Sequence, residues 1–259
     1  MRDQFVTIAT ADRIGTVTLD SPPSNLLGTA ALKQLDRIFG ELEADPTVRV
    51  VILTARGRHF CVGADIKELA KLGAAHEGAE LSGRGQGLLN RIERFDKPVI
   101  AAINGTCLGG GLEMAMACHM RVAAVGISLG LPEIKLGLIP GFGGTQRLQR
   151  IIGPSRASEM ILTGEPITAE QALTLGLVNR VVPSDQVVSE AQVLATMITS
   201  KGRLATRAAL RAIRTGLDSP FAEGLAHESE LFGELCETVD KKEGIAAFLE
   251  KRPPKFSNH

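Results

Sequence analysis

The sequence has 259 residues and balances 29 lysines and arginines against 29 aspartates and glutamates, so it carries no net charge that would attract nucleic acid or an anionic membrane. Hydrophobic residues make up 44% and charged residues 22%, which is typical of a soluble protein with core material for one large domain, or one domain with a terminal extension. Tyrosine and tryptophan are both absent, which excludes tyrosine as a catalytic acid and leaves few rings for stacking on bases.

The cysteines and the N-terminus favour a reducing, cytoplasmic location. None of the four cysteines, Cys61, Cys107, Cys118 and Cys236, has a partner at C-x-x-C spacing, which argues against a zinc site and a disulfide framework. The first residues resemble neither a signal peptide nor a transit peptide, and no apolar run approaches the ~20 residues needed to span a bilayer. The histidines show no metal-ligand spacing, so no metal is expected.

In chain order, the first two-thirds of the sequence predicts strands and helices that alternate. Two strands joined by a turn come first, and glycine-rich turns separate most of the later elements. Strands are predicted at 6–9, 15–19, 48–54, 98–103 and 121–124, and helices at 30–42, at 81–95 and directly after Gly110. Strand–turn–helix units that recur in this way indicate an α/β fold. The stretch 73–87 is polar and weakly patterned, and is predicted to be mobile.

From residue 155 onward the pattern becomes mainly helical. Helices are predicted at 155–162, 168–175, 185–200, 204–215, 221–236 and 241–249, with one strand at 176–182. The last helices carry apolar stripes, Phe221, Leu225, Leu231, Phe232 and Leu235 in one and Ile245, Ala246, Phe248 and Leu249 in the other. Such stripes either cover the core of the domain or meet a neighbouring subunit.

Three consecutive glycines stand where a helix is predicted to begin, in the run Gly109-Gly110-Gly111-Leu112-Glu113. Glycine leaves the backbone N–H groups unshielded, and the first N–H groups of a helix have no partner within it. These donors, at the positive end of the helix, favour an anion or a developing oxyanion. Glu113 follows directly, which suggests acid–base chemistry beside a polarised carbonyl group.

A second carboxylate and a second glycine-rich run lie about twenty positions further on. Leu131-Pro132-Glu133-Ile134 leads into Pro140-Gly141-Phe142-Gly143-Gly144. A third segment, from Phe60 through Ala64-Asp65-Ile66-Lys67 to Glu68, follows the strand predicted at 48–54. A strand that turns into a helix through small residues would present a further backbone donor there.

Together the three segments resemble the enoyl-CoA hydratase/isomerase (crotonase) family, and the likeness extends from about Ile14 to Phe256. The resemblance implies a spiral of ββα units at about 1–195, which binds a CoA thioester and carries the catalytic groups. It also implies a helical C-terminal region at about 196–259, which builds the oligomer and borders the acyl pocket. The family's trimers and dimers of trimers imply a homo-oligomer, with a hexamer preferred over a trimer.

The resemblance also implies a role for individual residues. The N–H groups of Ala64 and Gly110 match the pair that holds the thioester oxygen, and should lie within ~3 Å of one common point. Glu113 and Glu133 match the two carboxylates that handle the water and the α-proton. Gly141 matches the glycine near the attacking water, and the segment Ala64, Asp65, Ile66, Lys67 lies where the family's chain meets CoA. No separate cofactor is implied, because CoA is part of the substrate.

The leading hypothesis is a 2-enoyl-CoA hydratase, a lyase of fatty-acid metabolism. A Δ3-Δ2-enoyl-CoA isomerase needs only one carboxylate, so the presence of both glutamates favours hydration. A branched substrate such as a 3-methylglutaconyl thioester stays open. An RNA-binding relative would need a basic patch with aromatic residues, and Gly141-Phe142-Gly143-Gly144 lacks the context of a dinucleotide-binding fingerprint, so both of these alternatives are disfavoured.

Two positions depart from the family pattern. His119 stands where the family more often has an acidic residue, and a structural role is expected for it. Gly28 interrupts a loop in which family members usually follow Asn25 with Ala-Leu-Asn, which puts the contacts of that loop with CoA in doubt but not the reaction class.

Overall fold

In the first half of the molecule the chain winds as a spiral, and each winding contributes one strand to each of two sheets. The computed structural model describes residues 4–257. Strand β3 (Val50–Ala55) is followed by β4 (His59–Cys61), β5 (Val99–Ile103) by β6 (Thr106–Leu108), and β7 (Met120–Ala124) by β8 (Ser128–Gly130). Strands β3, β5 and β7 pair in parallel, and so do β4, β6 and β8. These stacked turns form the predicted spiral of ββα units.

The larger sheet has six strands in the order β1-β2-β3-β5-β7-β10. Strands β1 (Val6–Ala11) and β2 (Ile14–Leu19) form an antiparallel hairpin at one edge, and β10 (Arg180–Val182) pairs in parallel with β7 at the other. Every residue of β3 and β5 is buried, as expected for parallel strands covered on both faces. The smaller sheet has the order β4-β6-β8-β9, with β9 (Ile167–Thr168) antiparallel to β8.

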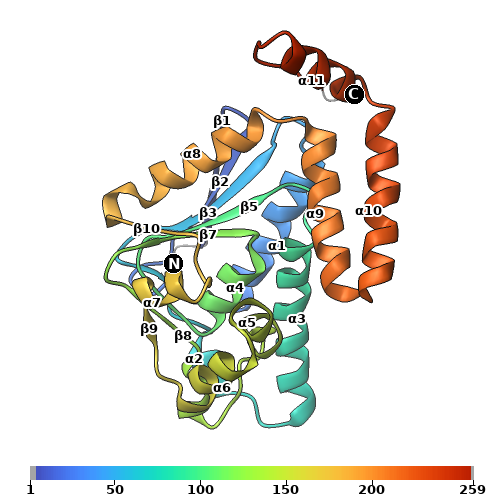
Figure 1. Ribbon diagram of the computed structural model, residues 1–259. Coiled ribbons are helices and arrows are strands. Elements are labelled where there is room, and N and C mark those ends of the chain that lie inside the picture. Colours follow the sequence, from blue (N-terminus) through green and yellow to red (C-terminus); the bar gives the residue numbers. More distant parts are fainter. Residues whose placement is uncertain (1–3, 258–259) are drawn as a thin grey trace.

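Helices cover both faces of the larger sheet (Figure 1). Helix α8 (Val187–Thr199) lies on one face and buries Val187, Ala191 and Ala195 against apolar side chains of β3, β5 and β7. The main core lies on the other face, where α1 (Thr29–Ala44), α3 (Ala75–Glu93) and α4 (Gly110–Ala117) pack. Helix α4 is buried along its whole length, so its first turn is held from several directions.

Short helices complete the spiral, and three long ones follow α8. The short ones are α2 (Ile66–Leu69), η1 (Pro132–Leu136), α5 (Gly144–Ile152), α6 (Pro154–Thr163), α7 (Ala169–Thr174) and η2 (Ser184–Gln186). Helices α9 (Arg203–Asp218), α10 (Phe221–Cys236) and α11 (Val239–Leu249) extend beyond the two-sheet core, with α10 packed on α9 (Figure 1). Across residues 4–257, none of the helices has both the length and the apolar character required to cross a bilayer.

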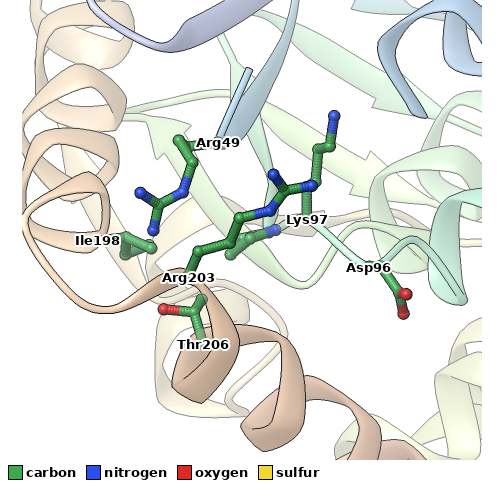
Figure 2. Close-up of a pocket in the computed structure, with 7 residues that line it drawn as sticks. Arg49, Asp96, Lys97, Ile198, Arg203 and Thr206 are labelled. Atoms are coloured by element: carbon green, nitrogen blue, oxygen red, sulfur yellow. The ribbon is translucent and has the colours of Figure 1, made fainter. Parts of the chain in front are cut away.

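Polar groups fasten α9 to the core. Arg207 and Arg211 both pair with Asp96, and Arg49 donates a hydrogen bond to the Lys201 carbonyl at 2.9 Å. Lys97 donates to the carbonyls of Leu42 and Asp45. Arg49, Lys97 and the first residue of α9, Arg203, gather around a small pocket at this corner (Figure 2). Since Arg49 and Lys97 bind backbone oxygens, their charges serve to anchor the chain.

The structure corrects the start of the helix predicted at 81–95, because α3 begins at Ala75 and includes most of the stretch 73–87. Glu77 accepts hydrogen bonds from the N–H groups of Gly73 and Ala74, at 2.8 and 3.0 Å, and so caps this start. The strand predicted at 176–182 is also shorter, since it spans only β10. The division proposed after residue 195 falls inside α8, and the nearest place at which a helix ends is residue 199.

Candidate active site

The three consecutive glycines are required by the backbone at the start of α4. Gly109 has φ 53°, a conformation that side chains disfavour, and a Cβ there would lie 2.8 Å from Glu133 Oε1. A Cβ on Gly111 would lie 2.3 Å from the carbonyl oxygen of Cys61 in β4, which is closer than any real contact. Gly110 between them is the first helical residue, and its N–H has no partner within the helix.

The segment that carries Ala64 lies against this same helix start. A Cβ on Gly63 would stand 3.8 Å from the Gly110 nitrogen and 3.6 Å from the Leu108 carbonyl oxygen. Leu27 donates its N–H to the Gly63 carbonyl at 2.9 Å, and Leu27 and Ala64 form an isolated parallel bridge. The structure therefore brings together the two backbone segments that the sequence analysis assigned to the thioester oxygen.

The neighbouring residues 65–68 have structural partners as well as exposed surface. Asp65 caps α2 by accepting the Lys67 N–H at 2.9 Å, whereas Ile66 is 53% exposed and Lys67 is exposed. Glu68 accepts hydrogen bonds from the Thr29 N–H and hydroxyl at 2.9 and 2.7 Å, and so caps α1 in place of a residue at position 28. A Cβ on Gly28 would lie 2.9 Å from Glu68 Oε1, which explains the departure noted there.

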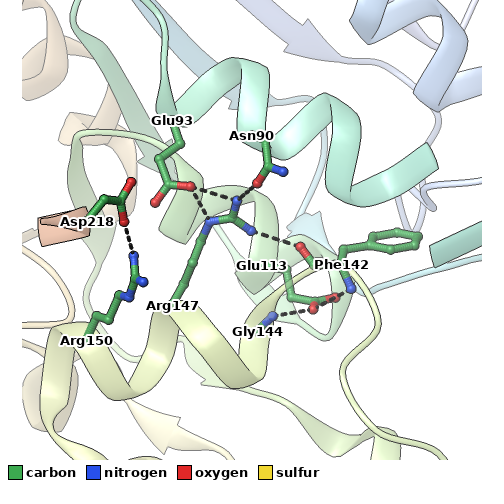
Figure 3. A network of polar contacts seen from close by, with 8 residues as sticks. All are labelled: Asn90, Glu93, Glu113, Phe142, Gly144, Arg147, Arg150 and Asp218. Atoms are coloured by element: carbon green, nitrogen blue, oxygen red, sulfur yellow. Dashed lines mark hydrogen bonds and ion pairs between the residues drawn. The ribbon is translucent and has the colours of Figure 1, made fainter. Parts of the chain in front are cut away.

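Glu113 is almost completely buried on the first turn of α4, with an exposed fraction of 1%. Its Oε1 accepts the N–H groups of Phe142 and Gly144 at 2.8 and 2.7 Å (Figure 3). Burial raises the pKa of Glu113 to about 7, with a further contribution from the like charge of Glu133, while the two N–H donors and Arg147 oppose the increase. Such a carboxyl group can exchange a proton near neutral pH.

Glu133 lies on η1 beside the glycine run. Burial also raises the pKa of this carboxyl group, and its Oε2 is buried without a hydrogen-bond partner among residues 4–257. A buried polar atom without a partner is uncommon and points to a functional site. Two carboxyl groups of raised pKa therefore interact beside the first turn of α4, which is an arrangement suited to transferring protons at neutral pH.

Gly141 belongs to the loop that holds Glu113. Its carbonyl accepts hydrogen bonds from the Ser82 hydroxyl at 2.5 Å and from Gln86 at 3.0 Å, both on α3. The next residue, Phe142, is buried and donates its N–H to Glu113. The loop thus connects α3 to the carboxylate.

Arg147 is the residue of this region that the sequence analysis missed. Its side chain is only 7% exposed and contacts Asn90, Glu93 and the Phe142 carbonyl (Figure 3). It shares the buried face of α5 with Gly144 and Leu148. The sequence did contain a signal for it, because an arginine stands at a position where the helical periodicity predicts a buried apolar residue.

The structural role expected for His119 is confirmed. His119 Nδ1 accepts the Val99 N–H at 2.9 Å, and burial lowers the pKa of this imidazole to about 4, so it is neutral at physiological pH. Cys107 and Cys118 are buried free thiols.

Glu113→Gln is expected to stabilise the fold at neutral and alkaline pH. The carboxyl group has a pKa of about 7 in the folded chain and an ordinary value of 4.5, so its contribution to stability is complete below 4.5 and is lost as the pH rises through 7. The loss is of the order of ~3 kcal/mol from the size of the shift. Thermal unfolding of both proteins between pH 4 and 8.5 should give a gap that widens with pH, whereas a constant gap would contradict this origin.

The chain is similar to known proteins in both sequence and structure. The chain matches the enoyl-CoA hydratase/isomerase family over residues 9–259. It is 43% identical to a probable enoyl-CoA hydratase of Bacillus subtilis over 97% of this chain and 98% of that protein. It is also 43% identical to the 2,3-dehydroadipyl-CoA hydratase of Escherichia coli, over 96% of this chain and 97% of that protein. A crystal structure of an enoyl-CoA hydratase from Bacillus anthracis gives a TM-score of 0.94 at 39% identity, over 99% and 100% of the two chains.

The chain therefore belongs to the enoyl-CoA hydratase/isomerase family of enzymes. Its spiral and C-terminal helices have the crotonase fold that the resemblance implied.

Proposed function

We propose that this enzyme adds water reversibly to a 2-enoyl-CoA thioester and gives a 3-hydroxyacyl-CoA. The observation that carries the proposal is the pair of interacting carboxyl groups of raised pKa, Glu113 and Glu133, beside the unshielded start of α4. Relatives at about 40% identity named as enoyl-CoA hydratases support it.

In this mechanism the N–H groups of Ala64 and Gly110 donate to the thioester oxygen. Water forms a bond to C3, the double-bond electrons move toward the thioester, and negative charge collects on that oxygen. Donors fixed at this point stabilise the enolate-like state more than the ground state, which lowers the barrier. Gly141 lies in the loop beside the attacking water, and Asp65, Ile66 and Lys67 adjoin the CoA moiety, which is substrate, so no separate cofactor takes part.

The two glutamates divide the proton transfers. Glu113 receives two N–H hydrogen bonds, which favour its ionised form, so it accepts the proton of the attacking water. Glu133 Oε2 receives none from residues 4–257, and burial raises the pKa of this carboxyl group. Glu133 therefore carries the proton that is delivered to C2.

The proposal is tested with crotonyl-, 2-hexenoyl-, 3-hexenoyl- and 3-methylglutaconyl-CoA, followed at the enoyl-thioester absorbance. Loss of absorbance with a 2-enoyl substrate is expected. Turnover of 3-hexenoyl-CoA alone, with a gain of conjugated product, would indicate that the enzyme is an isomerase and not a hydratase. Preference for the 3-methylglutaconyl thioester would indicate a branched-substrate hydratase.

We propose further that the enzyme is a cytoplasmic hexamer, with a trimer as the next candidate and closed symmetry in either case. Of the apolar stripes on the last helices, Leu231 is buried, but Phe221, Phe232 and Phe248 are 82%, 69% and 80% exposed. Exposed apolar side chains in such number are typical of a protein interface. Residues beyond about 195, α9 to α11 above all, would then serve trimer formation and border the acyl pocket.

Light scattering at micromolar concentration is expected to give the mass of six or three chains. Phe232→Glu should shift the distribution toward smaller species, whereas Glu228→Gln on the same helix should leave it unchanged. An active monomer would contradict the assembly and leave the hydratase proposal standing.

A further inference from the structure

The donors that hold Glu113 are themselves held by side chains from two helices. The C=O and N–H of a trans peptide point in opposite directions, so fixing one fixes the other. The carbonyl of Gly141 accepts hydrogen bonds from Ser82 and Gln86, at 2.5 and 3.0 Å. The N–H of the same peptide group, on Phe142, donates to Glu113 Oε1 at 2.8 Å. Helix α3 thereby aims this donor.

Arg147 holds the next peptide group of the loop. Its Nη1 donates to the Phe142 carbonyl at 2.9 Å. Gly144, two residues after Phe142 in the loop, supplies the second donor to Glu113, at 2.7 Å. The guanidinium is fixed in turn by Asn90 Oδ1 at 2.6 Å and by Glu93 Oε2 at 2.8 Å (Figure 3). A buried guanidinium with three such partners has one orientation, because its donors form a rigid planar fork.

The polar residues of α3 lie on one face of that helix. Ser82, Gln86, Asn90 and Glu93 follow at intervals of three or four residues, which places them in a row along the helix. All four contact the 141–144 loop or Arg147. The row is continuous from the Gly141 carbonyl to the guanidinium.

We propose that Arg147 is a positioning residue for the hydration reaction: together with the polar row of α3, it holds the 141–144 loop so that two N–H groups point at Glu113. Arg147 acts through the Phe142 carbonyl and does not touch the reacting atoms. Because this role presupposes that Glu113 accepts a proton, it rests on the function proposed above.

The charges around Glu113 give the direction of the expected pH effect. Glu133 faces it from η1 and raises its pKa, while Arg147 on α5 and the two loop donors lower it. Glu93 on α3 pairs with Arg147 and partly offsets that charge. Loss of Arg147 should therefore raise the pKa of Glu113 and move the limb of the kcat profile that requires its ionised form to higher pH.

The test compares Arg147→Met with Arg150→Met. Arg150 lies on the same helix and makes an exposed ion pair with Asp218 at 2.9 Å, so the control removes the same charge from α5 without touching the loop (Figure 3). With crotonyl-CoA, Arg147→Met should lower kcat about 10- to 100-fold, the scale of a misplaced catalytic group, and leave KM within about threefold. Arg147→Lys, which lacks the planar fork, should recover only part of the loss.

A double-mutant cycle distinguishes positioning from general damage. In the Glu113→Gln background, Arg147→Met should cost far less than in the wild type, because its effect passes through Glu113. Equal losses in the two backgrounds, or a pH profile like that of Arg150→Met, would overturn the proposal. If Arg147→Met does not fold, the double variant Ser82→Ala, Gln86→Ala provides the test, because it removes both hydrogen bonds to the Gly141 carbonyl. An unchanged kcat and pH profile in that variant would equally overturn the proposal.

The wild-type reaction separates this proposal from the one on which it rests. A wild-type protein inactive on every 2-enoyl thioester would refute the proposed function. If the wild type is active and Arg147→Met leaves kcat and its pH profile unchanged, only the positioning role is refuted.

Discussion

Glu113→Gln and Glu133→Gln are each expected to lower the rate of hydration by at least about two orders of magnitude, the scale of a lost acid–base group. Glutamine keeps the shape of the side chain and can still accept a hydrogen bond, but it cannot carry the transferred proton. Initial rates with crotonyl-CoA give kcat and KM, and KM should change much less than kcat. Near wild-type turnover in either variant would show that the two-glutamate mechanism does not apply.

Glu165→Gln is the matched control for these two variants. Glu165 pairs with Lys135 at 2.7 Å on the surface, and its side chain is 70% exposed. Its replacement should leave kcat within experimental error of the wild type. Isomerisation of 3-hexenoyl-CoA that survived in only one of the two active-site variants would favour the isomerase alternative.

Gly111→Ala is expected to destabilise the enzyme severely and to abolish its activity. The added Cβ would stand 2.3 Å from the Cys61 carbonyl oxygen and 2.9 Å from its carbonyl carbon, and both atoms are backbone within a buried region, so neither can move cheaply. Overpacking of this kind costs about 3 kcal/mol or more. For a chain of this size that corresponds to a fall of roughly 6–12 °C in the thermal midpoint, which circular dichroism can follow. A midpoint within 2 °C or so of the wild type would contradict the packing argument.

Gly83→Ala is expected to have the opposite effect on stability, although Gly83 also lies in a helix. Gly83 is exposed on α3, and nothing lies within 4 Å of its would-be Cβ. Alanine there should stabilise the fold by about 0.5–1 kcal/mol through its higher helix propensity. The contrast between the two substitutions isolates close packing from any general effect of replacing glycine.

The sequence alone predicted the elements with long, regular patterns. The buried runs at 48–54 and 98–103 correspond to β3 and β5 within two residues, and the amphipathic run at 30–42 to α1. Strands β4, β6 and β8 have three residues each, which is too short for a period of two to be recognised. Their pairing depends on contacts between successive turns of the spiral, which no local pattern records.

From the sequence, only those parts of the candidate site that lie in short motifs were predicted. The glycine run and both glutamates lie in short motifs, and the structure places them side by side. The hydrogen bonds that hold the donors to Glu113 join α3, the 141–144 loop and α5, whose residues are far apart in the sequence. Gly28 shows the same limit, since the carboxylate that takes over its capping role comes from Glu68, forty positions later.

The stacking of β4, β6 and β8 also governs when the site can form. Ala64, Gly110 and Glu133 follow these three strands in turn, and neighbouring strands lie about 4.8 Å apart, so residues distant along the chain converge at one end of a ladder. Contacts of such long sequence separation require the closure of large loops and are made late in folding. The helices of each turn can gain their structure while the ladder is still incomplete, but the donors and carboxylates have no common centre until the third rung is in place. The site therefore depends on contacts between distant parts of the chain, and no single segment can form it alone.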